Sequence, residues 1–551
     1  MKKAFLVILM LVLAGGLVLS GCGTPAPAPT PAPTPAPTPA PASVPPTGPP
    51  SPVPTPAPAP APAPPVVHAP EKYGGILRTV TIHDPSNFGD PLEVHGAMHE
   101  FARFSMQHLV KADPERPGYY LPLLAESWDL APDLSYYTFY LRKGVKFHDG
   151  TDFNAQAVKF DYDRVLAAPV PYLKEVSYIE VVDDYTVRFH LSQWNALIMS
   201  DLEREPCFIM SPTAYEKLGS EGLSTNPVGT GPWIIEELAR NQHIKYVKNP
   251  DYWEEGLPYL DGLEIIVMPD PMTRQASLLS GDIDVFWQAD RISTIDLAAM
   301  GYEYQSFVGQ NAVISYDSTS PESPWSDKRM REAMEYAVDK EKITTVLGQG
   351  MVKSSYSNIH SIRDWGDPGA APRMYDPDKA RQLIAEAGYA AGVKCLMRYG
   401  EQVNEDFVVA LQEDLANVGI DIELDFMTMP VQREVQRTPH VGNELRLEAI
   451  RYDPPNLLGA VRMDLSEKAE GMPSTKRPDG FEDLFEQAMA EVDPAKQLEL
   501  LLAAEKIAYE EVMTVPLWNA PMFSIYPSYV KDAKWYPTGP FQELQYAWFD
   551  K

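Results

Sequence analysis

The sequence predicts an α/β fold for most of the chain, behind an N-terminal extension that cannot form a core. From residue 327 onward helical and strand patterns alternate, which is typical of a sheet covered by helices. Between residues 76 and 191 shorter alternating segments are separated by turn residues, which favours antiparallel strands. At 551 residues, 44% of them hydrophobic, the chain is long enough for more than one packed unit.

The first residues have the pattern of an export signal. Lys2 and Lys3 precede an apolar run from Ala4 to Leu19, which is shorter than the ~20 residues that a membrane-spanning helix needs. The run ends in Leu19-Ser20-Gly21-Cys22, which resembles a bacterial lipobox, in which the cysteine is acylated. We therefore predict a lipoprotein signal peptide at 1–21 and a lipid anchor on Cys22. The alternative is a plain secretory signal with an incidental cysteine.

Residues 22–71 are predicted to be the acylated cysteine followed by a Pro/Ala-rich tether. From Thr24 to Val67, proline recurs at about every second position, which removes backbone donors and favours polyproline II. Such a segment is an extended spacer between a membrane anchor and a folded unit. The alternative is a ligand for an SH3-type domain, but the repeats lack flanking Arg or Lys.

The first folded segments are predicted to be strands. Alternating or β-rich residues occur at Ile76–Ile82, Tyr136–Leu141 and Tyr185–Leu191. The third segment follows Asp183-Asp184, a tight turn. Between the second and third segments, Asn154 is placed to cap a helix that runs to about Leu166.

Three helices are predicted in the second half of the chain. Asp327–Ile343 has apolar residues at helical spacing, with Ser326 as its predicted cap. Asp376 followed by Pro377 begins a helix that Gly388 ends. Phe407–Asn417 is amphipathic, and after Gly419 a strand is predicted at Ile420–Phe426.

Composition and motifs argue against several functions. The formal charge of −30, without a basic stripe, argues against a nucleic-acid partner. The three cysteines cannot form a disulfide framework, and Cys207 and Cys395 are expected to be buried small side chains. His95 and His99 are four residues apart, but Gly96 stands where a zinc hydrolase needs Glu. Because no catalytic motif appears either, we expect no enzyme, no cofactor and no metal site.

Several segments, in order, resemble the extracellular solute-binding proteins of family 5, the dipeptide-, oligopeptide- and nickel-binding proteins of ABC transporters. Gly229 and Gly231, in one of them, are expected to form a turn that requires glycine. The resemblance covers about 123–531, and the segments are Leu124-Ala125-Glu126-Ser127-Trp128, Leu141-Arg142-Lys143-Gly144-Val145-Lys146-Phe147, Asn226-Pro227-Val228-Gly229-Thr230-Gly231-Pro232-Trp233, Lys248-Asn249-Pro250-Asp251-Tyr252-Trp253, Ser280-Gly281-Asp282-Ile283-Asp284-Val285, Ser326-Asp327-Lys328-Arg329-Met330-Arg331 and Tyr375-Asp376-Pro377-Asp378-Lys379-Ala380.

The resemblance implies a two-lobed periplasmic-binding-protein fold of the class II type. It implies a hinge that the chain crosses twice and an extra β-rich subdomain inserted in lobe one. We therefore predict lobe one at 72–115, 228–312 and 516–551, the inserted subdomain at 116–227, and lobe two at 313–515.

The resemblance also implies the ligand-binding residues. Peptide-binding members hold the ligand's α-ammonium with an Asp of lobe two, and the matching stretch runs from Arg451 through Tyr452, Asp453 and Asn456 to Leu457. Asp453 is the predicted amine partner, although it can equally cap a turn before Pro454. Arg451 can meet a ligand carboxylate or a neighbouring acid.

Two aromatic residues complete the predicted ligand contacts. Trp287 precedes the first predicted hinge crossing, and Trp365 lies in a Gly/Pro-rich stretch. Aromatic side chains at cleft edges can stack on a ligand, and each of these two can also be packing.

The predicted function is that of a monomeric, lipid-anchored solute-binding protein, on the outer face of the cytoplasmic membrane or in the periplasm. It would capture a peptide-like ligand by interlobe closure and deliver it to an ABC permease. The alternative ligands on the same fold are an oligosaccharide, a nickel chelate and an opine-like conjugate. The alternative function is a surface sensor or adhesion module without transport.

Overall fold

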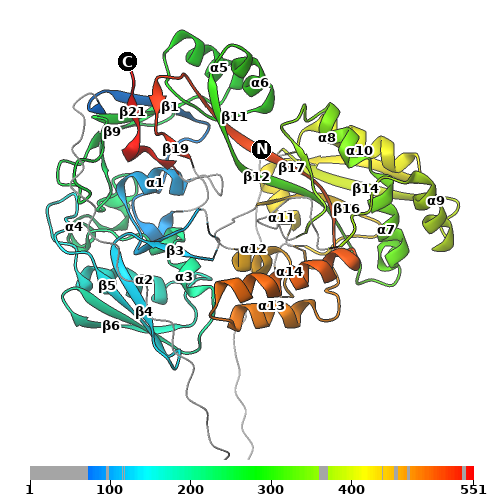
Figure 1. Ribbon diagram of the computed structural model, residues 1–551, viewed down its shortest axis with the longest axis horizontal. Helices are drawn as coiled ribbons and strands as arrows, with labels where there is room; N and C mark the ends of the chain where they lie inside the picture. The colour runs from blue at the N-terminus through cyan, green and yellow to red at the C-terminus, as the bar shows by residue number, and fades with distance from the viewer. Residues whose placement is uncertain are drawn as a thin grey trace, which may run out of the picture. The chain divides into compact units, whose positions relative to one another are not determined.

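The computed structural model describes residues 72–551, except 95–97, 115, 117, 359–369, 402, 437, 452–456, 468, 470–471 and 536–541. Three larger sheets organise this part of the chain, with helices packed against them (Figure 1). The signal peptide, Cys22 and the tether predicted for 1–71 lie outside the described residues. In the described segments no helix is both long and apolar enough to span a bilayer.

The first sheet joins the beginning of the described chain to residues 233–267. Its order is β1 (Ile76–Thr81), β10 (Gly262–Val267), β9 (His243–Lys248) and β8 (Trp233–Ala239). β1 pairs with β10 in parallel, and the other pairs are antiparallel. α1 (His99–Ser105) packs against this sheet with the buried side chains of Phe101 and Trp233. The strand predicted at Ile76–Ile82 is confirmed.

The second sheet is antiparallel and lies within residues 125–191. Its order is β4 (Ala125–Leu130), β5 (Tyr136–Leu141), β7 (Thr186–Leu191) and β6 (Val176–Asp183). α2 (Ala155–Ala167) begins at Asn154, whose side-chain oxygen accepts hydrogen bonds from the amides of Gln156 and Ala157. The two strands predicted here and the cap at Asn154 are confirmed.

The largest sheet has seven strands and carries the middle and the last third of the chain. Its order is β11 (Phe286–Ala289), β17 (Val515–Tyr526), β12 (Glu303–Tyr316), β16 (Leu445–Arg451), β14 (Val393–Gly400) and β15 (Ile420–Met427). The short β13 (Lys353–Ser354) pairs with β17. β14 runs parallel to both of its neighbours, β15 and β16.

Helices cover both faces of this sheet. Successive side chains of β12 point to opposite faces, so neighbouring residues of this strand belong to different cores. Ala312 and Ile314 belong to the core under α7 (Lys328–Ala337), α9 (Pro377–Glu386) and α10 (Glu405–Ala416). Val313 belongs to a second core with α12 (Leu457–Asp464), α13 (Phe481–Ala490) and α14 (Pro494–Glu510). This arrangement of helix, sheet and helix confirms the predicted α/β class.

The helix predicted at Asp327–Ile343 is in fact two helices. α7 ends at Ala337, and α8 (Lys340–Val346) begins after Asp339, whose carboxylate accepts a hydrogen bond from the amide of Lys342. The predicted cap, Ser326, is also wrong, because the carboxylate of Asp327 accepts the bond from the amide of Arg329. The helices predicted from Asp376 and from Phe407 are confirmed as α9 and α10.

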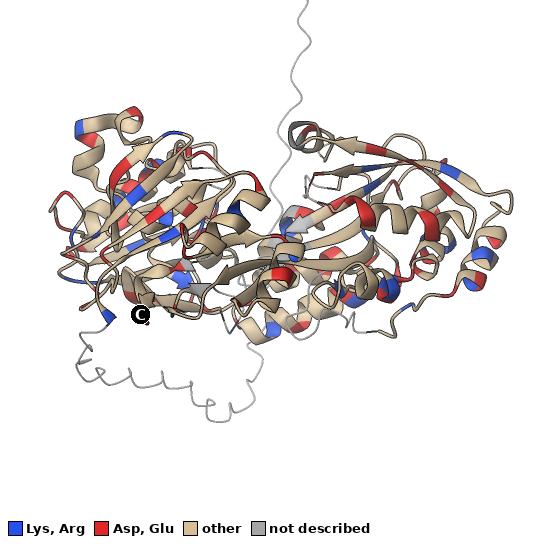
Figure 2. Cartoon of the chain, turned by 90° about the horizontal axis from the view of Figure 1, so that it is seen from above, with Lys and Arg blue, Asp and Glu red and all other residues tan. Residues whose placement is uncertain are grey.

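The remaining elements are short or peripheral. In Figure 2 segments coloured for Lys and Arg lie among segments coloured for Asp and Glu on the described helices and strands. The C-terminal strands return to the first sheet, because Val530, Leu544 and Ala547 belong to its core. These elements are β2 (Val110–Ala112), β3 (Tyr120–Pro122), α3 (Ile198–Asp201), α4 (Pro212–Leu223), α5 (Pro271–Ser280), α6 (Arg291–Ala299), α11 (Met429–Gln436), β18 (Val530–Lys531), β19 (Lys534–Trp535), β20 (Gln542–Glu543), β21 (Trp548–Phe549) and the 3₁₀ turns Pro91–Glu93, Glu205–Cys207, Pro324–Ser326 and Leu544–Tyr546.

Candidate functional site

Two long antiparallel strands connect the first sheet's core with the two cores of the large sheet. Glu303–Phe307 of β12 pairs with β17 beside β11, and Gln310–Ile314 pairs with β17 beside β16. The register shifts between Phe307 and Gln310, so regular pairing is interrupted between the two halves. Phe307 packs in the core of the first sheet, and Val313 packs in the core that contains α12, α13 and α14. A strand pair with an irregular middle is suited to act as a hinge.

Trp287 of β11 lies beside the end of this strand pair that contains Glu303–Phe307. Its indole stacks on the ring of Phe307, with 4.8 Å between centroids and 11° between planes. Only 3% of Trp287 is exposed, so in this conformation the side chain packs in the core. Whether it also contacts a ligand stays a prediction.

The stretch predicted to hold the amine partner begins at the irregular middle of β12. Arg451 is the last residue of β16 and pairs with Gln310. Tyr452, Asp453 and Asn456 lie outside the described residues, as does the side chain of Arg451. The chain is described again from Leu457, the first residue of α12.

The stretch that holds Trp365 begins beside the same part of β12. The side-chain amide of Asn311 donates to the carbonyl oxygen of Ser357 at 3.5 Å. The backbone amide of Asn358 donates to Glu505 of α14 at 2.7 Å. Residues 359–369, with Trp365, lie outside the described part. Arg451 and Ser357, which lie just before the two stretches with the other predicted contacts, therefore contact neighbouring positions of β12, Gln310 and Asn311.

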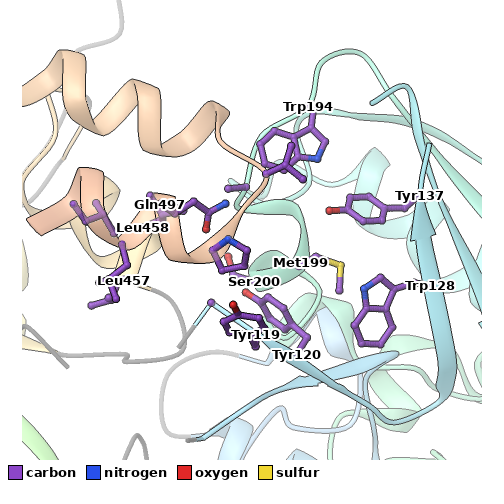
Figure 3. A pocket seen from close by; sticks show the side chains of 16 residues that line it. Tyr119, Tyr120, Trp128, Tyr137, Trp194, Met199, Ser200, Leu457, Leu458 and Gln497 are labelled. Atoms are coloured by element: carbon purple, nitrogen blue, oxygen red, sulfur yellow. The ribbon is translucent and has the colours of Figure 1, made fainter. Parts of the chain in front are cut away.

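A cavity lies between the second sheet and helices α12 and α14 (Figure 3). Its volume is about 240 Å³. Leu457 and Leu458, which directly follow the predicted amine-binding stretch, form part of one wall. The lining residues are Gly118, Tyr119, Tyr120, Trp128, Tyr137, Trp194, Ala196, Met199, Ser200, Leu457, Leu458, Val492, Pro494, Gln497, Leu498 and Leu501.

The polar side chains among the described lining residues of the cavity are uncharged. The hydroxyl of Ser200 donates to the carbonyl of Leu197 at 2.8 Å, and the amide of Gln497 donates to the carbonyl of Glu491 at 2.5 Å. Burial raises the pKa of the Tyr137 hydroxyl, which therefore stays protonated at neutral pH. The described part of the wall thus offers aromatic faces, with indole and phenol groups.

Three contacts tie the two walls together beside the cavity. The amide of Ala196 donates to the carbonyl of Met489 at 2.8 Å, and Leu197 is fully buried among side chains of α12–α14. Arg462 of α12 lies 3.5 Å from the carboxylate of Asp201 on α3. The cavity is therefore closed along one side in this conformation.

Two further carboxyl groups lie on the elements that flank the amine-binding stretch. Glu448 of β16 accepts a hydrogen bond from Gln436 at 2.7 Å, and Asp464 is in α12. Burial raises the pKa of both, and the neighbouring Glu448 contributes to the value of about 7 for Asp464. A cation near this pair would lower both pKa values and be stabilised in return.

Sequence reasoning missed the aromatic lining of the cavity. Tyr119 and Tyr120 are adjacent aromatic residues just before the Leu-Ala-Glu-Ser-Trp segment, and Trp194 stands in the polar stretch Ser192-Gln193-Trp194-Asn195. The sequence signal available for this lining was the presence of large aromatic residues in polar, loop-like segments. Nothing in the sequence showed that they meet α12 and α14.

Comparison with known families now identifies this architecture. The family model of the bacterial extracellular solute-binding proteins, family 5, matches residues 120–442. The chain belongs to this family. It is therefore an extracytoplasmic solute-binding protein, and the resemblance seen in the sequence is confirmed. The family 5 fold also accounts for the two lobes and the crossing strands.

Individual members of family 5 are similar over most of the chain. The glutathione-binding protein GsiB of Shigella flexneri is 29% identical over 427 residues, which are 72% of this chain and 80% of that protein. A peptide-bound DppA of Helicobacter pylori has a TM-score of 0.72 at 24% identity and matches 87% of this chain and 99% of its own. NikA of Brucella suis, bound to Fe(III)-EDTA, has a TM-score of 0.75 at 22% identity, over 86% of this chain and 100% of its own.

Proposed function

We propose that this family 5 protein captures a peptide-like solute between its lobes and delivers it to the permease of an ABC importer. The observation that carries the proposal is the common anchoring of two stretches on the crossing strand β12. Arg451 pairs with Gln310, and Ser357 accepts from Asn311, so the described residues just before 452–456 and 359–369 lie at neighbouring positions of β12. A solute held there would touch both lobes at once.

The chemistry of the relatives favours a peptide-like ligand. GsiB is named for glutathione, a tripeptide, and the DppA structure holds the peptide STSA. A peptide needs a carboxylate for its ammonium and backbone groups for its amides. Asp453 is the residue proposed for the ammonium, with Arg451 for a carboxylate and Tyr452, Asn456, Trp287 and Trp365 as further contacts.

The carboxyl groups of Glu448 on β16 and Asp464 on α12 support a solute that carries a cationic group. Glu448 is 5% exposed, and burial raises its pKa and that of Asp464 because their charged forms lack water. An ammonium bound by Asp453 would add positive potential on this side of lobe two. Binding would therefore be accompanied by proton release from Asp464, whose pKa is about 7.

The role of Asp453 can be tested by calorimetry. Asp453→Asn keeps the side-chain shape and removes the charge, so the bound ammonium loses its partner. That loss costs roughly 2–5 kcal/mol, which is a 30-fold to several-thousand-fold weaker Kd. We expect this loss for a free tripeptide, with the thermal stability of the apo-protein unchanged.

The same tripeptide with an acetylated N-terminus is the matched ligand control. It lacks the ammonium, so the parent protein should bind it as weakly as Asp453→Asn binds the free peptide. Equal affinity of the parent for both forms would show that the amine is not recognised, and a non-peptide solute would replace the peptide in this proposal.

We further propose that Cys22 carries the lipid that holds the protein at the membrane surface. Two or three acyl chains give stable anchoring, whereas one does not. Cys22→Ala should therefore move the protein from the membrane fraction to the soluble fraction, with unchanged thermal unfolding of the released protein. Retention of Cys22→Ala in salt-washed membranes would place the anchor elsewhere.

A further inference from the structure

The first and second sheets form one packed unit, because a single segment of the chain lies in both of their cores. Cys207 and Ile209 belong to the core of the second sheet, whereas Phe208 and Met210 belong to the core of the first. The backbone of Gln107 also pairs with Ile209. Helices α12, α13 and α14 pack on the large sheet, beyond the irregular middle of β12. A contact between the second sheet's unit and these helices therefore spans the hinge.

Leu197 makes such a contact. It follows β7 of the second sheet, yet it is fully buried in the core that contains α12, α13 and α14. Ile198, the next residue, and Leu202 are also fully buried, but in the core of the second sheet. The short segment around α3 thus packs on its own sheet and inserts one large apolar side chain into the core across the hinge (Figure 1).

Hydrogen bonds within its own segment fix the backbone of Leu197. Its amide donates to the side-chain oxygen of Asn195 at 2.7 Å, and its carbonyl oxygen accepts from the hydroxyl of Ser200 at 2.8 Å. Both partners lie on the same side of the hinge as Leu197, so this conformation does not depend on the contact with α12–α14. Insertion of the side chain therefore costs little backbone entropy.

Polar contacts accompany the apolar one. The amide of Ala196 donates to the carbonyl of Met489 at 2.8 Å, and the guanidinium of Arg462 lies 3.5 Å from the carboxylate of Asp201. Water can replace these partners when the two sides separate, so their net contribution is small. The side chain of Leu197 would instead become exposed to water. Among these three contacts, the insertion of Leu197 therefore contributes most of the stabilisation.

We infer that Leu197 is a releasable latch across the hinge, which stabilises the closed conformation before any solute binds. Its release requires no unfolding of either side, because α3 keeps its own packing through Ile198 and Leu202. The effect of the latch on affinity rests on the proposed capture between the lobes. A solute that binds the closed conformation binds more tightly when that conformation is already populated. Leu197 thus adds to the affinity without contacting the solute.

The latch can be measured without a solute by pulsed electron paramagnetic resonance. Val182→Cys on β6 and Lys506→Cys on α14 place nitroxide labels at exposed sites on the two sides. Cys207 and Cys395 are buried and stay unlabelled, and the full chain carries Cys22→Ala. Native mass spectrometry establishes that the dialysed protein holds no solute. We expect two distances, a short one for the latched conformation and a longer one for the released conformation.

Leu197→Asn removes the apolar contact at nearly constant side-chain size. In this core the amide would lack a hydrogen-bond partner, so the ratio of the short to the long population should fall at least about tenfold. Leu197→Met stays apolar and should keep the ratio of the parent. Leu202→Ala removes a leucine side chain from the second sheet's own core, so it should lower the thermal stability and leave the ratio unchanged.

The distances and the thermal stability can each overturn the inference. Absence of the short distance in the solute-free parent would mean that the contact forms only with a solute. An unchanged ratio in Leu197→Asn would mean that this side chain does not stabilise the closed conformation. If Leu197→Asn is unfolded, the contact is a permanent part of the fold and not a latch.

Failure of the proposed peptide capture would give a different result. The distances are measured without a solute, so they test the latch even if no tripeptide binds the parent. For a free tripeptide that does bind, calorimetry should give a Kd at least about twofold weaker for Leu197→Asn than for the parent, with Leu197→Met at the parent value. Equal Kd values for Leu197→Asn and the parent would overturn the inference.

Discussion

At Asp201 burial and charge act against each other. Its side chain is 1% exposed, and it accepts a hydrogen bond from the amide of Leu173 at 3.0 Å. Burial raises its pKa from 3.8 to about 6, although Arg462 of α12, 3.5 Å away, lowers it. The residue joins α3 to α12 beside the cavity, so its protonation state affects a contact between the two walls.

Asp201 should make the stability of the protein depend on pH in a defined direction. Because the pKa in the folded state, about 6, lies above the ordinary value of 3.8, the folded protein binds this proton more tightly than the unfolded chain. The contribution to the free energy of unfolding is therefore full below about pH 4 and is lost as the pH rises through about 6.

Asp201→Asn removes this titration and keeps an oxygen for the Leu173 amide. Between about pH 4 and pH 6, the free energy of unfolding of the parent should fall relative to that of the variant by on the order of 3 kcal/mol. Urea unfolding across this range gives the difference. Parallel pH profiles for the two proteins would show that Asp201 does not titrate as described.

Some residue roles could be predicted from the sequence, and others depend on distant parts of the chain. Cys207 and Cys395 are both buried, as predicted, and for Cys207 the prediction came from its apolar neighbours. Gly229 and Gly231 were assigned to a turn that requires glycine, but the requirement is steric. A Cβ at these positions would lie 2.3 Å from the carbonyl oxygen of Ser105 and 2.7 Å from that of Phe104, respectively. Both carbonyl groups belong to α1, so a local sequence pattern cannot reveal this close approach.

At the scale of elements, capping residues were more informative than periodicity. Asn154 and Asp376 each cap a helix because their side-chain oxygens accept bonds from free amides of the first turn. Periodicity extended the helix at 327 through to Ile343, because Ile343 keeps the apolar spacing. The chain instead breaks at Val338, and the carboxylate of Asp339 starts a new helix. A local hydrogen bond thus outweighed the continuous pattern.

The N-cap of α14 offers a test at this scale. Asp493 accepts a hydrogen bond from the amide of Ala495, and Pro494 occupies the first helical position. Asp493→Ala should lower the free energy of unfolding by about 1 kcal/mol, since one amide of the first turn loses its partner. Asp493→Asn keeps an acceptor and should retain most of the stability in urea unfolding. Equal losses in both variants would mean that charge, and not the cap bond, is what Asp493 contributes.

Which elements meet could not be predicted from local sequence. The strands β12 and β17 are separated by about 200 residues of chain, and their pairing brings Arg451 and Ser357 to neighbouring positions. The aromatic wall of the cavity and its partner α14 are even farther apart in sequence. Asp453, Tyr452, Asn456 and Trp365 lie outside the described residues, so their roles stay predictions. The family segments indicated the fold because, taken in order, they span most of the folded chain, which no local pattern does.

At the scale of the molecule, the two lobes are expected to close on the solute. The register shift between Phe307 and Gln310 provides an irregular point about which β12 and β17 can bend. A solute with micromolar Kd supplies about 8 kcal/mol, which exceeds an opening preference of a few kcal/mol. Small-angle X-ray scattering should therefore show a smaller radius of gyration with a saturating tripeptide than without it.

An acetylated tripeptide at the same concentration is the control for this scattering experiment. It should leave the radius of gyration at the value of the free protein, because it is not captured. Superimposable scattering curves for the free and saturated protein would argue against closure, even if binding were detected by calorimetry.

The central claim is that this protein captures a peptide-like solute, and the solute that co-purifies with it tests that claim most directly. The full chain, isolated from the cells that produce it and studied by native mass spectrometry, should carry a mass that disappears on unfolding. Fragmentation of the released species is expected to yield amino-acid residues. A released oligosaccharide, metal chelate or opine would contradict it.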